Sequence, residues 1–415
     1  MDTIPPLSLP ILLDGATGSE LYKRGMPAGA YTEQWVLGHP EALLELQRGY
    51  VAAGSQGLIA PTFGANRVRL EQHGIFGQVA DYNRRLVELS RQAAGGRALV
   101  AGDMAPTGLF IAPFGESSFE ELVAIYTEQA AALAAAGVDL FLIETTMTMP
   151  EARAAVLACK SVSDRPVWVT FTCDENGRTL SGTDVLAALI VMQGMGVDAF
   201  GLNCSSGPAE MLEQMRRLTP YTTVPLIAKP NAGLPETVEG QAVYHCPPEE
   251  FASYAAGFAA AGVRIFGDCC GTTAGHVAAL RAAVEAVDFS AFVPPRRDPD
   301  VIPCASEKEA RFITPDIDVG ETIECTSDLL EDILEAEENA PQGALKIAIY
   351  DEDDLYTFAE NQYAVKDALC LWTDVPELLE QALRLYQGRA FWDGTGELEA
   401  AFLQEMARKY GLVLL

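Results

Sequence analysis

Short apolar segments alternate with amphipathic stretches along the first 290 or so residues of the chain. Each apolar segment is a run of Val, Ile, Leu or Phe that ends in small or polar residues, as buried strands do. Eight such runs occupy residues 10–18, 57–65, 98–106, 140–146, 166–172, 199–206, 225–233 and 264–272. The Ala-, Leu- and Glu-rich stretches between them have helical spacing, and the clearest predicted helices span 119–136, 151–161, 184–195, 249–261 and 274–286.

About eight strand–helix units in under 300 residues favour an α/β fold of the (β/α)8 TIM-barrel type, because such barrels usually take about 250 residues. The runs are almost continuously apolar, which is typical of parallel strands covered by helices. A doubly wound open sheet is the alternative architecture for the same alternation.

In such barrels the functional groups lie where the strands end and the following loops begin. Polar residues and thiols occupy this position in the predicted strands. They are Asp14, Thr62, Asp103, Glu144, Thr172, Asn203, Cys204, Asn231, Cys269 and Cys270. The pattern therefore predicts a site at the carboxyl end of the barrel.

The amino-acid composition of the sequence changes after residue 292. The next residues form a Pro- and charge-rich segment that is typical of a linker. The following residues are acidic, yet they contain strand-like runs at 344–351, 368–374, 388–394 and 411–415 that alternate with helical stretches. We therefore expect a barrel over residues 1–292, a linker over 293–310 and a smaller α/β domain over 311–415. The acidic runs are most simply solvated helix faces.

The composition narrows the class of protein. The formal net charge is −30, which argues against binding to nucleic acid, because that needs a basic surface. The sequence has no uncharged apolar run of about 18 residues, so no membrane span is expected. The first residues lack the basic start and cleavage site of a signal peptide, and the nine cysteines are too few for a disulfide scaffold. We therefore expect a soluble cytoplasmic protein with reduced thiols.

Three cysteines stand at expected strand ends. Cys204 follows the sixth run, and the adjacent Cys269 and Cys270 follow the eighth, between Gly267 and Gly271. Neighbouring strand residues point to opposite faces, so both adjacent sulfurs can converge only if the glycines let the backbone leave strand geometry. Since the ends of the sixth and eighth strands flank the seventh, the three thiolates could form three corners of a tetrahedral Zn²⁺ site.

The four histidines all lie away from the strand ends, so the fourth position of such a site would be open to a substrate. A thiol bound there would lose its proton and become a thiolate nucleophile at neutral pH, which suits alkyl transfer to sulfur. The two alternatives are a structural zinc and a redox-active cysteine pair.

Six motifs occur in a fixed order: LLDGATGSEL (12–21), TFGANRVRL (62–70), FLIETT (141–146), GLNCSSGP (201–208), KPNAG (229–233) and GDCCGTT (267–273). Over about residues 8–290 the chain thereby resembles the zinc-dependent homocysteine S-methyltransferases. That family includes the homocysteine module of cobalamin-dependent methionine synthase and the betaine- and S-methylmethionine-dependent enzymes. The resemblance implies an enzyme in which Cys204, Cys269 and Cys270 hold Zn²⁺, homocysteine sulfur is the fourth ligand, and methyl transfer yields methionine.

The resemblance also implies contacts for the rest of homocysteine. Glu144 is placed to accept its ammonium group, and Asp14 and Gly15 begin the loop that would meet its polar end. The further expected substrate contacts are Thr62, Asn203 and Asn231. Structural roles are the alternatives, such as a barrel salt bridge for Glu144 and a turn for Asp14.

One residue departs from the family pattern. Position 268 is aspartate, whereas the family usually has glycine there. Aspartate tolerates unusual backbone angles, so we expect the turn to be kept. The added charge beside an anionic metal site would lower the rate or disfavour anionic methyl donors, more than it would weaken metal binding.

The identity of the methyl donor is not specified by the motifs. The sequence lacks an Asp-x-His-x-x-Gly corrinoid motif, so we expect either a small-molecule donor or a separate methyl-corrinoid protein. Residues 374–415 resemble the middle of the pterin-binding (folate) barrel of methionine synthases, but 311–323 lack its opening motif. The tail therefore resembles a degenerate half of that barrel.

The alternative function follows from this tail. The chain would be a homocysteine- and zinc-binding subunit of a split methionine synthase that docks on a separate corrinoid or folate protein. The acidic tail would then be the docking surface; a dimerising or a solubilising surface is an equal expectation.

Overall fold

The computed structural model describes residues 8–238, 241–295, 297–339 and 343–415. The first seven residues, on which part of the signal-peptide expectation rests, lie outside these ranges, as does residue 296 of the expected linker. In the described part of the chain, no helix combines the length and the apolar character needed to cross a membrane.

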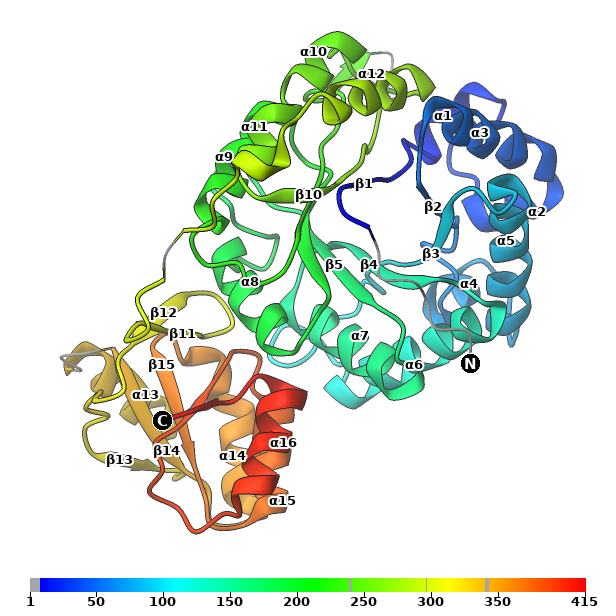
Figure 1. Ribbon diagram of the computed structural model, residues 1–415. Coiled ribbons are helices and arrows are strands. Elements are labelled where there is room, and N and C mark those ends of the chain that lie inside the picture. The colour runs from blue at the N-terminus through cyan, green and yellow to red at the C-terminus, as the bar shows by residue number, and fades with distance from the viewer. Residues whose placement is uncertain (1–7, 239–240, 296, 340–342) are drawn as a thin grey trace.

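Eight parallel strands form the expected barrel (Figure 1). They are β1 (Ile11–Leu12), β2 (Gly57–Ile59), β3 (Leu99–Met104), β4 (Leu140–Thr146), β5 (Val167–Phe171), β6 (Ala199–Asn203), β7 (Leu226–Lys229) and β10 (Val263–Phe266). The pairing order is β1-β10-β7-β6-β5-β4-β3-β2, and a bridge between Leu13 and Gly57 joins β1 to β2. A doubly wound sheet would leave two open edges, so the barrel prediction is confirmed and the alternative is not.

Helices on the outside of the barrel connect these strands. They are α1 (Gly18–Lys23), α2 (Thr32–Gly38), α3 (Pro40–Ala53), α4 (Arg67–Gln72), α5 (Val79–Ala94), α6 (Phe119–Ala136), α7 (Met149–Val162), α8 (Val185–Gly194), α9 (Pro208–Leu218), α10 (Pro248–Ser253), α11 (Ala255–Ala260) and α12 (Ala274–Glu285). The helix predicted at 249–261 is divided into α10 and α11, because the Tyr254 N–H bonds to the carbonyl of Phe251, three residues back, which tightens the turn.

Helix α6 shows how the local sequence sets these boundaries. The side chain of Ser118 accepts a hydrogen bond from the N–H of Glu121 at 3.1 Å, which caps the first turn. The helix ends at Gly137, whose φ of +83° is a left-handed conformation that glycine adopts without strain. The predicted span of 119–136 is therefore the observed one.

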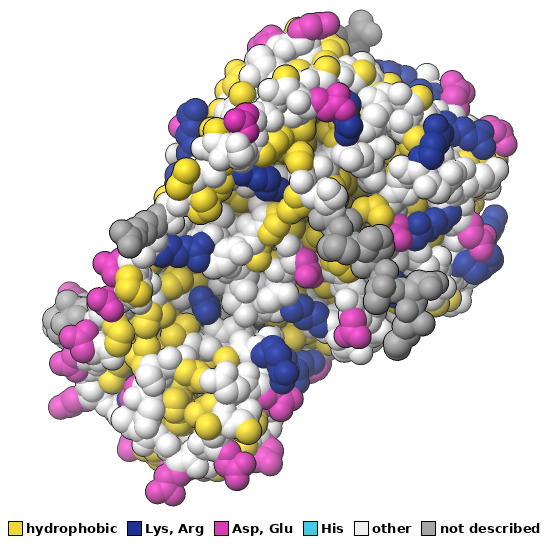
Figure 2. All heavy atoms as spheres, in the orientation of Figure 1, with side chains coloured by type: hydrophobic (Ala, Val, Ile, Leu, Met, Phe, Trp, Pro, Cys, Tyr) yellow, Lys and Arg dark blue, Asp and Glu magenta, His cyan; other side chains and the backbone are white. Residues whose placement is uncertain are grey.

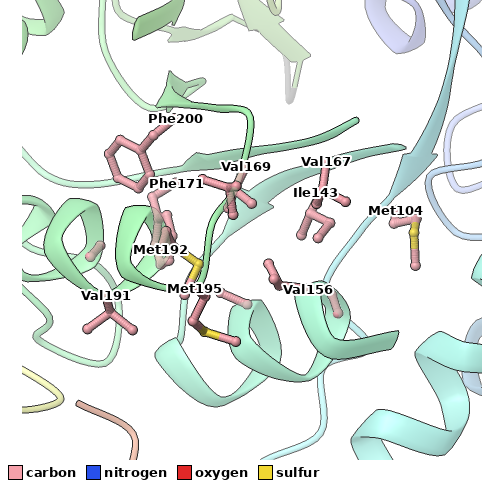
Figure 3. Packing of buried hydrophobic residues seen from close by; sticks show 14 of the residues in the cluster. Met104, Ile143, Val156, Val167, Val169, Phe171, Val191, Met192, Met195 and Phe200 are labelled. Carbon is pink, nitrogen blue, oxygen red and sulfur yellow. The ribbon is translucent and has the colours of Figure 1, made fainter. Parts of the chain in front are cut away.

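Two apolar layers hold the barrel together. The inner layer comes from alternate strand positions, and it includes Leu140, Leu142 and the fully buried Trp168. The outer layer packs the strands against the helices, and Figure 3 labels Phe171 of β5 and Met192 of α8 among its members. Because the barrel interior is filled, the polar strand ends are left at its mouth.

A smaller α/β unit follows the barrel, as expected. It opens with an antiparallel hairpin of β11 (Ile302–Ala305) and β12 (Ala310–Ile313) and continues with a five-stranded parallel sheet. The sheet strands are β13 (Thr322–Glu324), β14 (Ala344–Ala348), β15 (Ala368–Trp372), β16 (Phe391–Trp392) and β17 (Val413–Leu414), and the helices are α13 (Leu329–Asn339), α14 (Glu352–Asn361), α15 (Pro376–Leu385) and α16 (Ala400–Tyr410). Acidic side chains are spread along its outer edge in Figure 2.

The sheet strands of this unit follow one another in chain order, as they would in a stretch of a barrel. The likeness to half of a pterin-binding barrel stays a prediction. The domain limits at 292 and 310 also stay predictions, although β11 begins within the span expected to be a linker.

The barrel and the C-terminal unit meet at α8 (Figure 1). This helix is apolar on all sides, and a helix of that kind must be covered on all sides. One side packs on β5 and β6, and the other contacts β11, β12 and α16. The C-terminal unit thus covers an apolar helix that would otherwise face water.

Arg153 of α7 adds a polar contact to this junction. Its guanidinium is fully buried, and it donates hydrogen bonds to the carbonyls of Gly388 at 3.0 Å and Leu383 at 2.7 Å. Charge-assisted hydrogen bonds of this kind are strong when water is excluded. These two bonds add to the apolar contacts that join the two units at α8.

We predict that Arg153→Ala lowers the free energy of unfolding by about 3 kcal/mol, because it leaves two buried carbonyls without donors and opens a cavity. Denaturant unfolding measures the loss. The matched control is Arg84→Ala on the exposed face of α5, which removes surface ion pairs with Asp81 and Glu88 and should cost less than about 1 kcal/mol. Equal losses for the two variants would contradict the buried junction.

Candidate metal centre and substrate cavity

The three predicted thiols meet at the mouth of the barrel. The sulfur atoms of Cys204, Cys269 and Cys270 all lie within 4.8 Å of one another. Cys204 directly follows β6, and the adjacent pair lies in the loop after β10, on either side of β7. The structure therefore brings together the residues that the sequence placed at the ends of the sixth and eighth strands.

Unusual backbone angles make this convergence possible. Cys204 and Ser205 have φ values of 61° and 59°, and Thr145 at the end of β4 has 57°. Non-glycine residues seldom adopt this left-handed conformation, which carries a cost and is found mostly at functional sites. These are the three non-glycine residues with positive φ in the described chain, and all three lie at this mouth.

The loop that holds the adjacent pair is hydrogen-bonded to the segment that follows β7. The N–H of Cys269 donates to the carbonyl of Pro230 at 2.9 Å, and the carbonyl of Cys270 accepts from Ala232 at 3.0 Å. Gly271 has a φ of +83°, and a Cβ there would lie 2.3 Å from the Cγ of Tyr244. The expected glycine requirement therefore holds at Gly271, where it makes room for an aromatic ring that packs against the cysteines.

The protonation states of the three thiols depend on one another. Hydrogen bonds from Cys269 and Cys270 hold the pKa of Cys204 far below its usual value, and the same contacts raise the pKa of Cys269 and of Cys270. Burial and the neighbouring Cys270 raise the pKa of Tyr244. The cluster therefore favours one thiolate, and a cation at its centre would stabilise the other two.

A cavity of about 540 Å³ opens beside these sulfurs. Its charged lining residues are Glu33, Arg69, Asp103, Glu144, Lys229 and Asp268. Tyr31 and His73 form a stacked pair in its wall, with ring centroids 4.1 Å apart. The volume suits a small polar ligand rather than a macromolecular one.

A buried ion pair crosses the floor of this cavity. Lys229, the last residue of β7, donates to Glu144 of β4, and the Lys229 side chain is only 2% exposed. Burial alone would lower the pKa of Lys229, but Glu144, Cys269 and Asp103 together raise it. Glu144 was expected to receive a substrate ammonium, and the structure shows that one of its oxygens already holds a lysine.

Three further carboxyl groups are buried nearby. Burial raises the pKa of Asp14 to about 7, and it raises those of Asp103 and Asp268 as well. Asp14 accepts a hydrogen bond from the N–H of Ile59 at 3.1 Å, whereas neither oxygen of Asp268 has a partner among the described residues. The mouth thus contains more acidic groups than its one lysine can neutralise.

The other expected substrate contacts occupy two kinds of position. Gly15 lines the cavity, and a Cβ there would lie 2.8 Å from the ring of Tyr50. Thr62 is fully buried and bonds to the backbone of Asp103, while Asn203 bonds to Thr145 and Thr170 behind the wall. Asn231 is buried and helps to lower the pKa of Cys204. A substrate contact for these residues stays a prediction.

Sequence reasoning missed two residues that line or cover the site. Lys229 stands in the KPNAG motif, which drew attention to Asn231 instead. Tyr244 lies outside the six motifs, so its contact with Cys270 had no signal in the sequence.

Comparisons with known proteins agree on a family. A family model described as homocysteine S-methyltransferase matches residues 11–284. The methionine synthases of Mycobacterium tuberculosis and Mycobacterium leprae are each 34% identical to this chain over 257 residues. That segment is 59% of this chain but 22% and 21% of those relatives, so the chain matches about a fifth of their length.

A protein of known structure matches the barrel part of this chain. The homocysteine methyltransferase MmuM from Escherichia coli, in a metallated form, is 27% identical with a TM-score of 0.57, over 66% of this chain and 95% of that one. Its oxidized form has a TM-score of 0.56 at the same identity and the same coverage.

We predict a pH dependence of stability from Asp14. Because burial raises its pKa from 3.8 to about 7, the folded chain keeps a proton that the unfolded chain has lost between about pH 4 and about pH 7. The contribution of this group to stability is therefore full below about pH 4 and falls by about 4 kcal/mol by about pH 7. Urea unfolding of wild type and Asp14→Asn across this range measures it. The variant should lose less stability as pH rises, and parallel curves would show that Asp14 is ionised in the folded chain.

Proposed function

The chain belongs to the homocysteine S-methyltransferase family, and from that premise we propose that it transfers a methyl group to the thiol of L-homocysteine and so forms methionine. The family and its relatives make it a methyltransferase enzyme. The observation that carries the specific proposal is the cluster of three sulfurs beside a cavity of about 540 Å³, which has room for an amino acid.

The three sulfur ligands support zinc as the cofactor. Three cysteine sulfurs are a common ligand set for Zn²⁺, and in a tetrahedron with Zn–S bonds of about 2.3 Å they would stand about 3.8 Å apart. The observed upper limit of 4.8 Å fits that spacing. Among the described His, Cys, Asp and Glu residues the cluster has three members, and we take the fourth tetrahedral position to be open to a ligand from outside. When bound there, zinc would hold a substrate thiol in its deprotonated form.

The chain's own residues would position the two reactants. Cys204, Cys269 and Cys270 hold the site at one end of the cavity, and the buried pair of Lys229 and Glu144 fixes its floor. The acceptor sulfur forms its bond to the methyl carbon while the bond to the donor breaks, the bonding electrons leave with the donor, and the thiol proton goes to solvent. Positioning of this kind supplies much of the rate in group transfer.

A second candidate is a subunit of a split methionine synthase. Its support is that the named methionine synthase relatives extend far beyond the matched segment, and that an acidic unit follows the barrel here. In that case a separate corrinoid or folate protein would deliver the methyl group. A small-molecule donor and a protein donor are distinguished by the same assay.

The test is methionine formation by the zinc-loaded chain with homocysteine and a panel of donors. The panel contains S-methylmethionine, S-adenosylmethionine, betaine, methyltetrahydrofolate and methylcobalamin. Turnover with a free donor supports the enzyme acting alone, and turnover only after addition of a methyl-corrinoid or folate protein supports the split subunit. A zinc-loaded chain that is inert under every condition contradicts both.

We predict that Cys269→Ser abolishes zinc binding and methyl transfer, because two thiolates hold zinc much less tightly than three. Metal analysis and the methionine assay measure the two effects. The matched control is Cys246→Ser, a partly buried thiol outside the cluster, which should keep about one zinc ion per chain. Unchanged zinc content and turnover in Cys269→Ser would rule out the three-cysteine centre.

A further inference from the structure

Asp268 lies in the wall of the cavity, and its carboxyl group is buried without a partner among the described residues. Asp268 is 2% exposed, it lines the cavity, and both of its side-chain oxygens lack a hydrogen bond among the described residues. Its own N–H contacts the carbonyl of Asp14 at 3.4 Å, so the main chain is held while the side chain is not. An unsatisfied buried carboxyl is costly, and a ligand with hydrogen-bond donors would remove that cost.

One oxygen of Glu144, the acceptor expected from the sequence, already holds Lys229. Glu144 is paired with Lys229, and both side chains are nearly inaccessible to water, at 11% and 2% exposure. A second ammonium at Glu144 would place two cations side by side in a site with little screening. Glu144 is therefore the weaker site for the ammonium of an incoming ligand.

We propose that Asp268 receives the α-ammonium group of the acceptor amino acid and thereby selects amino-acid thiols over thiols without an amino group. The proposal rests on the proposed function, because it takes the acceptor sulfur to lie at the three-cysteine cluster. It names Asp268 as a substrate-binding residue that sets specificity.

The position of Asp268 supports this assignment. Asp268 directly precedes Cys269, so their Cα atoms are about 3.8 Å apart. In homocysteine three carbon atoms separate the sulfur from the ammonium nitrogen, so one molecule with its sulfur at the cluster has the reach to place its ammonium at the neighbouring residue. Asp103 also has an unpartnered oxygen in the cavity wall, but it belongs to β3, three strands from β10 around the barrel.

The experiment compares two thiols on the zinc-loaded full-length chain. Homocysteine and 4-mercaptobutanoate, which lacks only the amino group, are titrated by calorimetry into wild type, Asp268→Asn and Asp268→Gly. The matched control is Glu33→Gln, which alters another carboxyl of the same cavity, one that already accepts a hydrogen bond from Gly64. The quantity is the ratio of the two dissociation constants in each variant.

Wild type should bind homocysteine about 10- to 100-fold more tightly than 4-mercaptobutanoate, as expected for one hydrogen bond to a charged group. In both Asp268 variants that ratio should fall to near one, while 4-mercaptobutanoate binds as before and Glu33→Gln keeps the wild-type ratio. A wild-type ratio near one overturns the proposal even if the variants do not fold. A ratio unchanged in Asp268→Asn or Asp268→Gly, or lowered equally in Glu33→Gln, also overturns it.

Failure of this proposal and failure of the proposed function give different results. If both thiols bind only when zinc is present, the result supports the metal centre, whatever the ratio of the two dissociation constants. If neither thiol binds, or zinc makes no difference, the proposed function itself fails.

Discussion

The approach of three cysteine sulfurs to one point is the constraint on which the rest of this site depends. Ionisation of all three sulfurs within 4.8 Å of one another is unfavourable without a cation, because like charges repel strongly where water is excluded. The backbone is strained at the same place, because Cys204 and Ser205 adopt left-handed φ angles although neither residue is glycine. A rigid barrel can maintain such an arrangement because its closed sheet fixes the start of each loop.

The charges around the cluster follow from the same constraint. Lys229 lies at the end of β7, between the two strands that carry the cysteines, and it places one buried positive charge below them. Glu144 fixes that lysine, and Asp268 remains with free acceptor oxygens. The cavity therefore presents soft sulfur ligands at one end and hard oxygen acceptors beside them, which are complementary to a thiol and an ammonium in one small molecule.

The sequence pattern predicted the scaffold well and the site in part. The eight apolar runs became the eight barrel strands because buried parallel strands need continuous apolar residues, and the strand ends therefore located the cysteines. The pairing of Glu144 with Lys229 was not predictable, because it joins residues 85 positions apart whose side chains meet only across the closed barrel. The position of Asn203 behind the wall likewise depends on the left-handed turn at Thr145, which no local pattern announces.

The central claim is that three protein sulfurs hold zinc with one position open to a substrate thiol. Zinc K-edge X-ray absorption on the zinc-loaded chain, with and without homocysteine, tests it most directly. The account predicts three sulfur neighbours from the protein at about 2.3 Å without substrate and a fourth when homocysteine is added. A zinc ion that already has four protein ligands, or whose sulfur count does not change with homocysteine, would contradict it.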